Sequence, residues 1–218
     1  AIDKETASTI LDYNNKPVTA QISNTGTMQA NGGTVILKAE ALPGLFEKAI
    51  NMGGYVKADR MENKDGKILL EANGKIDITT EITASSKISV KAPEISTSTL
   101  SSPIIEVYKT GGDIHVSNVQ KVDDLITMEG TGLKVTYMVT SDFTLRSDNA
   151  IDTTPGAILQ GNSLTLIANK FGTIATPLTV DASKLHITRT LGDIDITEST
   201  GLGTSILICG PPIDGFGQ

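Results

Sequence analysis

The chain has 218 residues, of which 39% are apolar and 4% aromatic, with no tryptophan and a formal net charge of −7. A core built from this composition consists mainly of Ile, Leu, Val and Ala, which suits thin stacked layers better than one bulky centre. The Lys and Arg residues are scattered along the chain, whereas nucleic-acid binding needs a concentrated basic surface. We therefore expect no nucleic-acid partner and no electrostatic docking on anionic lipid.

Cysteine and hydropathy patterns add further exclusions. A single cysteine, Cys209, excludes an intrachain disulfide framework and a multi-cysteine metal site. Because Ile208 flanks it, we expect Cys209 to be a buried thiol. No run of 18 apolar residues occurs, so no membrane span is expected. No signal peptide precedes Ala1, as expected if the chain begins after a cleavage site or is a piece of a longer protein.

The first 20 residues are polar and irregular, and we interpret residues 1–20 as a lead-in. From residue 21 onward a unit recurs in which a turn residue precedes apolar residues at alternate positions. This alternation predicts strands with Ile, Val and Leu on one face and Lys, Thr, Asp and Ser on the other. Copies of the unit begin at Gly33, Gly66, Gly74, Ser86, Gly112, Gly132, Asp142, Asn162 and Gly192.

One stretch breaks the strand pattern. Residues 39–51 read AEALPGLFEKAIN, with few β-branched residues and with Leu42, Leu45, Phe46 and Ala49 at spacings of three and four. Such spacing is typical of a short amphipathic helix, with Pro43 near its first turn. We predict a helical insert near residues 41–51 that packs on the flank of the strands or shields one end.

The spacing between the copies predicts the architecture. Starts at 66 and 86, at 112 and 132, and at 142 and 162 are each 20 residues apart, and a near-fixed period of this size indicates stacked repeats. We predict an all-β parallel β-solenoid (β-helix) over residues 21–208, followed by an extended tail over residues 209–218. An antiparallel sandwich remains the alternative, because Asn-Gly and Asp-Gly pairs, the turn signals of β-hairpins, occur at residues 31–32, 65–66 and 73–74.

Two segments resemble a known family. The first is NTGTMQANGGTVILKA at residues 24–39, followed by AIN at 49–51 and GYVKA at 54–58; the second covers residues 162–201. Together they cover about half of the chain and resemble filamentous-haemagglutinin-like large exoproteins of the bacterial two-partner-secretion type. The resemblance implies a right-handed parallel β-helix from a bacterial surface or secreted protein. Such proteins are exported through an outer-membrane partner and act as adhesins, filaments or stalks that carry toxin tips.

The chain departs from complete members of that family. It is much shorter, and its first segment begins where the family's secretion domain usually ends. We therefore expect either a piece of a longer parent chain or a subunit that self-associates end to end, because open solenoid ends leave unpaired backbone groups.

Candidate catalytic and metal-binding residues are few. Some sugar-cleaving enzymes are parallel β-helices, and the adjacent acidic pair Asp123 and Asp124 could serve such chemistry only with further basic or acidic companions. No such companions stand out, so we expect a solvated turn there. His115 and His186 alternate with buried positions and are expected to point outward, 71 residues apart and without a cysteine partner. We thus predict no catalytic, cofactor-binding or metal-binding residues.

Glycines and threonines have structural and functional interpretations. The pairs at residues 32–33, 53–54 and 111–112 lack the spacing of phosphate-binding loops, and turn glycines explain them. Ser and Thr are frequent at outward positions, as in ISTSTLSS at residues 95–102; such a face could bind glycans or ice, but Thr also suits any solvated strand.

We expect a non-catalytic structural or adhesive module, extracellular or on the bacterial surface, with a possible host-surface or glycan ligand. The alternative is a carbohydrate-active β-helix enzyme, a lyase or hydrolase.

Overall fold

The computed structural model describes residues 11, 15, 17–29, 33–39, 48–53, 56–58, 66–189, 191–199 and 205–209. Their regular structure is entirely β-strand, and none of them lies in a helix. It follows that no helix in this part of the chain is long and apolar enough to cross a membrane. The prediction of an all-β chain is confirmed for the described residues.

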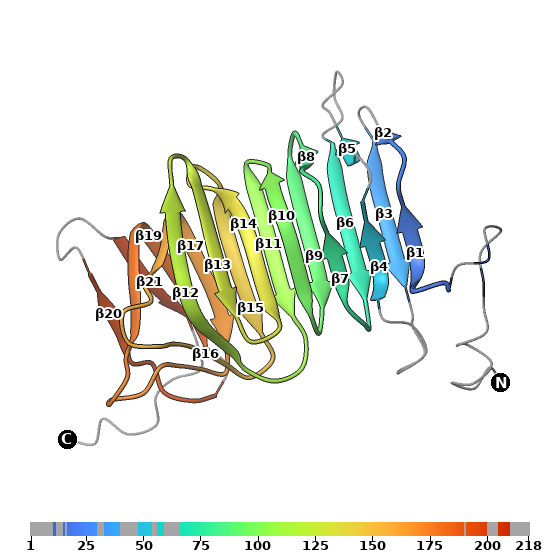
Figure 1. The fold of residues 1–218 in the computed structure, drawn as a ribbon. Coiled ribbons are helices and arrows are strands. Elements are labelled where there is room, and N and C mark those ends of the chain that lie inside the picture. Colours follow the sequence, from blue (N-terminus) through green and yellow to red (C-terminus); the bar gives the residue numbers. More distant parts are fainter. Residues whose placement is uncertain are drawn as a thin grey trace, which may run out of the picture.

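The described strands form two sheets, shown in Figure 1. Sheet 1 has 12 strands: β1 (Ala20–Asn24), β2 (Met28–Gln29), β4 (Lys48–Met52), β5 (Val56–Ala58), β7 (Ile76–Ile78), β8 (Ile82–Ala84), β10 (Ile95–Ser101), β12 (Ile114–Val122), β13 (Leu125–Gly130), β14 (Leu133–Met138), β16 (Ala150–Thr153) and β18 (Lys170–Phe171). Sheet 2 has nine: β3 (Thr34–Ala39), β6 (Lys67–Ala72), β9 (Lys87–Ala92), β11 (Ile104–Lys109), β15 (Asp142–Ser147), β17 (Leu159–Ala168), β19 (Leu178–Arg189), β20 (Ile196–Glu198) and β21 (Ser205–Cys209).

The chain passes back and forth between the two sheets, and strands from successive passes pair in parallel. In sheet 2, for example, β6 pairs with β9 and β9 with β11, while β7, β8 and β10 lie between them in sequence and belong to sheet 1. Later in sheet 2, Asp142, Ser163, Lys184 and Ser205 are successive partners, 21 residues apart. Parallel pairing with a repeated step makes the fold β-solenoid-like.

The core is a set of aliphatic ladders between the sheets. Leu70, Val90, Val107, Leu145 and Leu166 are partners on five successive strands of sheet 2, and each is 0% exposed. Their positions follow from the period of two in a strand, which sends alternate side chains to opposite faces. Full burial of such a side chain contributes about 1.5–3 kcal/mol. Stability is therefore distributed along the stack instead of being concentrated in one centre.

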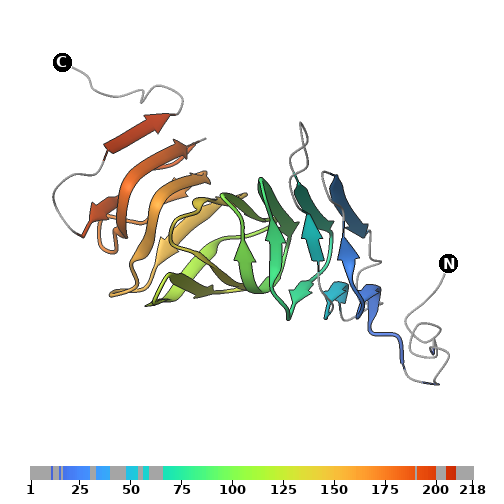
Figure 2. The same cartoon turned by 90° about the horizontal axis from the view of Figure 1, so that it is seen from above.

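An antiparallel meander interrupts the parallel stack of sheet 1. Strands β12, β13 and β14 pair antiparallel, and their outer neighbours β10 and β16 pair with them in parallel. Between β10 and β16, sheet 1 advances by four inter-strand spacings. Over the matching part of sheet 2, between β9 and β15, the advance is only two spacings. The two additional steps lengthen sheet 1 by about 10 Å. Figure 2 shows the C-terminal strands turned away from the line of the N-terminal ones, as this unequal length requires.

Aromatic side chains fill the interior beside the meander. The rings of Tyr137 in β14 and Phe143 in β15 stack 3.9 Å apart with an interplanar angle of 10°, and both are at most 1% exposed. The Tyr137 hydroxyl donates to the backbone carbonyl of Gln160. Burial raises the pKa of this phenol, so it stays neutral. Bulky rings thus occupy the place where the aliphatic ladders alone would leave space.

The recurring unit of the sequence corresponds to strands of both sheets. The copies that begin at 33, 66, 86, 142 and 162 contain β3, β6, β9, β15 and β17 of sheet 2, whereas those at 74, 112 and 132 contain β7, β12 and β14 of sheet 1. Two of the three 20-residue spacings are parallel steps within sheet 2. The third, from 112 to 132, instead spans the antiparallel meander. Hairpin pairing, the sign of the alternative sandwich, is thus present locally within the described chain.

The predicted helical insert is not observed. Residues 48–51 of the predicted span belong to strand β4, and residues 41–47 lie outside the described residues. Ile50 is 0% exposed and is the partner of Ile22 in β1 and of Ile76 in β7. Pairing on both sides with buried strands outweighs the weak helical preference of a short segment, because propensity is worth only tenths of a kcal/mol per residue.

The predicted boundaries stay untested as domain limits. The strands of the described chain extend from Ala20 to Cys209, close to the predicted solenoid over residues 21–208. Most of the lead-in, residues 1–20, and the tail beyond Cys209 lie outside the described residues.

Candidate functional site

Outward side chains of sheet 2 form rows that run across the strands, along the stack. Since the strands are parallel and in register, side chains at equivalent positions lie next to one another. One row, here called the Arg146 row, consists of Lys38, Glu71, Lys91, Tyr108, Arg146, Ile167 and Thr188. It begins on β3 and ends on β19, and it contains most of the charged contacts on this face.

Glu71 is held between two lysines in the Arg146 row. Its Oε2 lies 2.8 Å from Nζ of Lys38 and its Oε1 lies 2.8 Å from Nζ of Lys91. Hydrogen bonds from Lys38 and Lys91 lower the pKa of Glu71 from 4.5 to about 2, and the bond to Glu71 raises the pKa of Lys91. These contacts connect three successive strands, β3, β6 and β9, so they tie neighbouring passes of the chain together.

Tyr108 lies between two cations in the same row. Nζ of Lys91 is 5.5 Å and Cζ of Arg146 4.2 Å from the centre of its ring, distances at which cations are attracted to an aromatic face. Its hydroxyl donates to Asp148, whose other oxygen accepts from the backbone N–H of Gly111 at 2.9 Å. These hydrogen bonds, first that from Tyr108, lower the pKa of Asp148, and the bond to Asp148 raises the pKa of Tyr108.

Two shallow hollows lie along this row and share Lys91. One, of about 300 Å³, is lined by Lys38, Glu71 and Lys91 together with smaller neighbours. The other, of about 230 Å³, extends over Tyr108 and Arg146. Because Lys91 lines both hollows, they are neighbours on the outer face of sheet 2.

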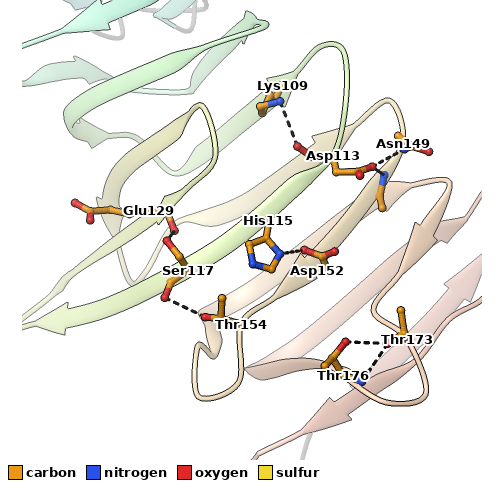
Figure 3. Close-up of polar contacts among 11 residues, drawn as sticks. Lys109, Asp113, His115, Ser117, Glu129, Asn149, Asp152, Thr154, Thr173 and Thr176 are labelled. Carbon is orange, nitrogen blue, oxygen red and sulfur yellow. Dashed lines mark hydrogen bonds and ion pairs between the residues drawn. The ribbon is translucent and has the colours of Figure 1, made fainter.

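A second set of polar contacts lies on strands β12 and β16 of sheet 1 (Figure 3). His115, with 45% of its side chain exposed, pairs through Nδ1 with the carboxylate of Asp152. Near the other end of the strand pair, the Thr154 hydroxyl donates to the carbonyl of Ser117 at 3.1 Å. Because these contacts join residues 37 positions apart on adjacent parallel strands, their evident role is to hold one pass of the chain to the next.

The turn before β12 is closed in a similar way. One carboxylate oxygen of Asp113 accepts from the side-chain amide of Asn149 and from the backbone N–H of Ala150, the latter at 3.0 Å. Gly111 and Gly112 precede it with φ values of 68° and 74°, which confirms the prediction of turn glycines at this pair. Of the other two predicted pairs, Gly32 and Gly54 lie outside the described residues.

The predicted acidic pair lies at a hairpin tip. Asp123 and Asp124 form the two-residue turn between β12 and β13, both side chains are exposed, and Asp123 has a φ of 52°. Neither carboxylate takes part in an ion pair or hydrogen bond within the described chain. This is the solvated turn that the sequence predicts. The same part of the chain holds no group of three His, Cys, Asp or Glu side chains placed to bind a metal ion.

The two histidines and the cysteine have different environments. His115 points outward, as predicted, whereas His186 is half-buried beside Leu207 of β21, and its Nε2 is covered without a hydrogen-bond partner among the described residues. The prediction for Cys209 is wrong, because this thiol is exposed. Cys209 is the register partner of Thr188 at an outward position. Even the inward-facing Ile206 and Ile208 of this terminal strand are 53% and 57% exposed.

Sequence reasoning did not single out Lys91, Tyr108 and Arg146. They occur on strands 17 and 38 residues apart in sequence, so no local motif contains them. Aligning the strands by their inward Val90, Val107 and Leu145 would have placed them in one row.

Comparison with models of protein families, with curated proteins and with solved structures found no match to this chain.

Proposed function

We propose that the chain is a right-handed parallel β-helix and serves as a non-catalytic structural or adhesive module of a bacterial surface or secreted exoprotein. The observation that carries this proposal is the parallel stack itself, in which strands pair in register from β3 to β21 across sheet 2. Such a stack resists bending because each pass is bonded to the next, so it can hold binding faces at a distance from their attachment point. The resemblance of residues 24–58 and 162–201 to filamentous-haemagglutinin-like exoproteins supports the same role.

The polar contacts support a scaffold in preference to a catalytic centre. Glu71 with its lysines, His115 with Asp152, and Thr154 with Ser117 each join neighbouring strands. A glycan-cleaving site would need two carboxylates facing each other across a substrate. Asp123 and Asp124 lie instead at an exposed turn. Incubation of the chain with polysaccharides should therefore release no reducing ends; sustained release would favour the carbohydrate-active alternative.

Strand β21, the last of the described strands, indicates how one module could join another. Among the described strands β21 pairs with β19 alone, and Ile206, Leu207 and Ile208 are each more than 50% exposed. Unpaired strand edges with apolar side chains favour addition of a further strand. The module is therefore proposed to continue end to end, either into a parent chain or into a second copy.

Sedimentation velocity over a range of protein concentrations tests this association. We expect the weight-average sedimentation coefficient to rise with concentration, and Ile206→Asp with Ile208→Asp to reduce that rise because they place charge at the edge. Ile104→Asp is the matched control, since Ile104 is 39% exposed in the middle of sheet 2. A chain that is monomeric at every concentration would contradict self-association.

A further inference from the structure

The guanidinium of Arg146 lies on the outer face of sheet 2, and its N–H donors are available for hydrogen bonding. Its side chain is exposed, and within the described chain it takes part in no hydrogen bond or ion pair. Its Cζ lies over the Tyr108 ring, 4.2 Å from the ring centre. Asp148, an acidic group that interacts electrostatically with Arg146, already accepts hydrogen bonds from Tyr108 and from the backbone N–H of Gly111. A planar guanidinium with free N–H donors matches a carboxylate in a two-bond, side-by-side geometry.

The surroundings of Arg146 suit a sugar. The 230 Å³ hollow beside it contains the apolar side chains of Leu69 and Ile167, the hydroxyl of Thr144 and the carboxylate of Glu106. Glu106 is itself held by Lys87 at 2.6 Å. A sugar ring has apolar faces of C–H groups and a polar edge of hydroxyl groups. Apolar side chains with a few directed polar groups can contact both kinds of surface.

The face is basic although the chain as a whole is acidic. Along the outward positions of sheet 2 from β3 to β19 the basic side chains are Lys38, Lys67, Lys87, Lys91, Arg146 and Lys184. The acidic ones at these positions are Glu71, Glu106, Asp142 and Asp181, two fewer than the basic ones. The formal net charge of the chain is −7, so positive charge is concentrated on this side. A long anionic ligand would be attracted here and repelled by the rest of the surface.

We propose that the outer face of sheet 2 binds an acidic polysaccharide, whose chain lies along the Arg146 row and one of whose sugar carboxylates pairs with Arg146. The inference rests on the proposed adhesive function and specifies its ligand. The two hollows both border Lys91, and between them their lining residues extend from Lys38 on β3 to Ile167 on β17, which suits an extended polymer. Glu71 and Glu106, interleaved with the cations, can accept hydrogen bonds from the hydroxyl groups of the sugars.

Binding of the full chain to immobilised polygalacturonate at low salt tests the proposal. We expect Arg146→Gln to weaken the apparent Kd about tenfold or more, since a hydrogen-bonded charge pair is worth about 1.5–3 kcal/mol. Lys134→Gln is the matched control, because it removes one positive charge from the exposed face of sheet 1 and should change the Kd less than about twofold. Circular dichroism would verify that both variants remain folded.

Two further ligands separate the possible sources of binding. Fully methyl-esterified polygalacturonate keeps the sugar chain and removes the carboxylate charge, and we expect it to bind at least about tenfold more weakly. Dextran sulfate supplies negative charge without carboxylates; tighter binding of dextran sulfate than of polygalacturonate would overturn the assignment to a carboxylate. Absence of binding to polygalacturonate, or equal losses for Arg146→Gln and Lys134→Gln, would overturn the proposal itself.

These results are separable from those for the proposed function. A chain that self-associates but loses no polygalacturonate affinity on Arg146→Gln would retain the scaffold role and lose this binding face. A chain that binds through Arg146 but stays monomeric would retain the binding face and lose end-to-end association.

Discussion

At the scale of single residues, position within a row decides what a charged side chain does. Glu71 and Arg146 lie in the same outward row. Glu71 forms ion pairs with both Lys38 and Lys91, whereas the guanidinium of Arg146 lies over the aromatic ring of Tyr108. The first residue therefore contributes mainly to cohesion between strands and the second is available to a ligand. Exposed ion pairs are individually weak, so the role of Glu71 is best detected through its dependence on pH.

We expect Glu71→Gln to lower the melting temperature at pH 7 and to have a shrinking effect in acid. Because the pKa of Glu71 is about 2 in the folded chain against a usual value of 4.5, its contribution is complete above about pH 4.5. That contribution is lost as the pH falls towards 2. Thermal unfolding of both proteins between pH 7 and pH 2.5 measures the difference. Asp123→Asn is the control, and a gap for Glu71→Gln that stays constant with pH would contradict the assignment.

At the scale of elements, alternation in the sequence was a reliable guide to strands and a poor guide to their partners. The copy at Gly66 and the copy at Ser86 are true neighbours in sheet 2, but the equally spaced copies at Gly112 and Gly132 enter an antiparallel meander. Period and apolar pattern are the same in both cases. What differs is the tight turn at Asp123 and Asp124, whose two acidic residues indicated a solvated turn without indicating a hairpin.

For the short segment around Ile50, the sequence pattern predicts the wrong type of element. Its side-chain spacing predicts a helix, but buried pairing of Ile50 with Ile22 and Ile76 makes it a strand. That pairing depends on residues 28 and 26 positions away, which a local pattern does not contain. The Arg146 row was missed for the same reason, since register between distant strands creates it.

Close contact between β12 and β13 makes Gly130 indispensable to the meander. A Cβ at this position would lie 2.3 Å from the carbonyl oxygen of His115, far inside van der Waals contact. We expect Gly130→Ala to lower the free energy of unfolding by about 2 kcal/mol or more, because backbone must move to admit the methyl group. Urea titration measures this change. Gly26→Ala is the matched control, as the nearest atom to its Cβ would be 3.9 Å away; equal effects of the two substitutions would contradict the described packing.

At the scale of the whole molecule, parallel pairing of strands extends the stack and the antiparallel meander changes the direction in which it runs. Sheet 2 provides an uninterrupted series of parallel strands from β3 to β21, and the additional strands of sheet 1 bend the stack at one place (Figure 2). The stacked β-architecture could be predicted from the composition and the repeated spacing. The bend could not be predicted, because it depends on which of the three 20-residue spacings contains an antiparallel hairpin.

Distances between spin labels test the central claim of a parallel, in-register stack most directly. In a Cys209→Ser background, labels at Lys67 and Ser163 and, separately, at Glu71 and Ile167 span the same four strand steps of sheet 2, from β6 to β17. The account predicts backbone separations of about 19 Å for both pairs, since each step is about 4.8 Å. Parallel strands in register keep both separations near this value. Strands that run in opposite directions would offset at least one of the two pairs by about 13 Å or more along the strand axis, and a shifted register would lengthen both separations. A separation clearly longer than about 19 Å for either pair would contradict the account.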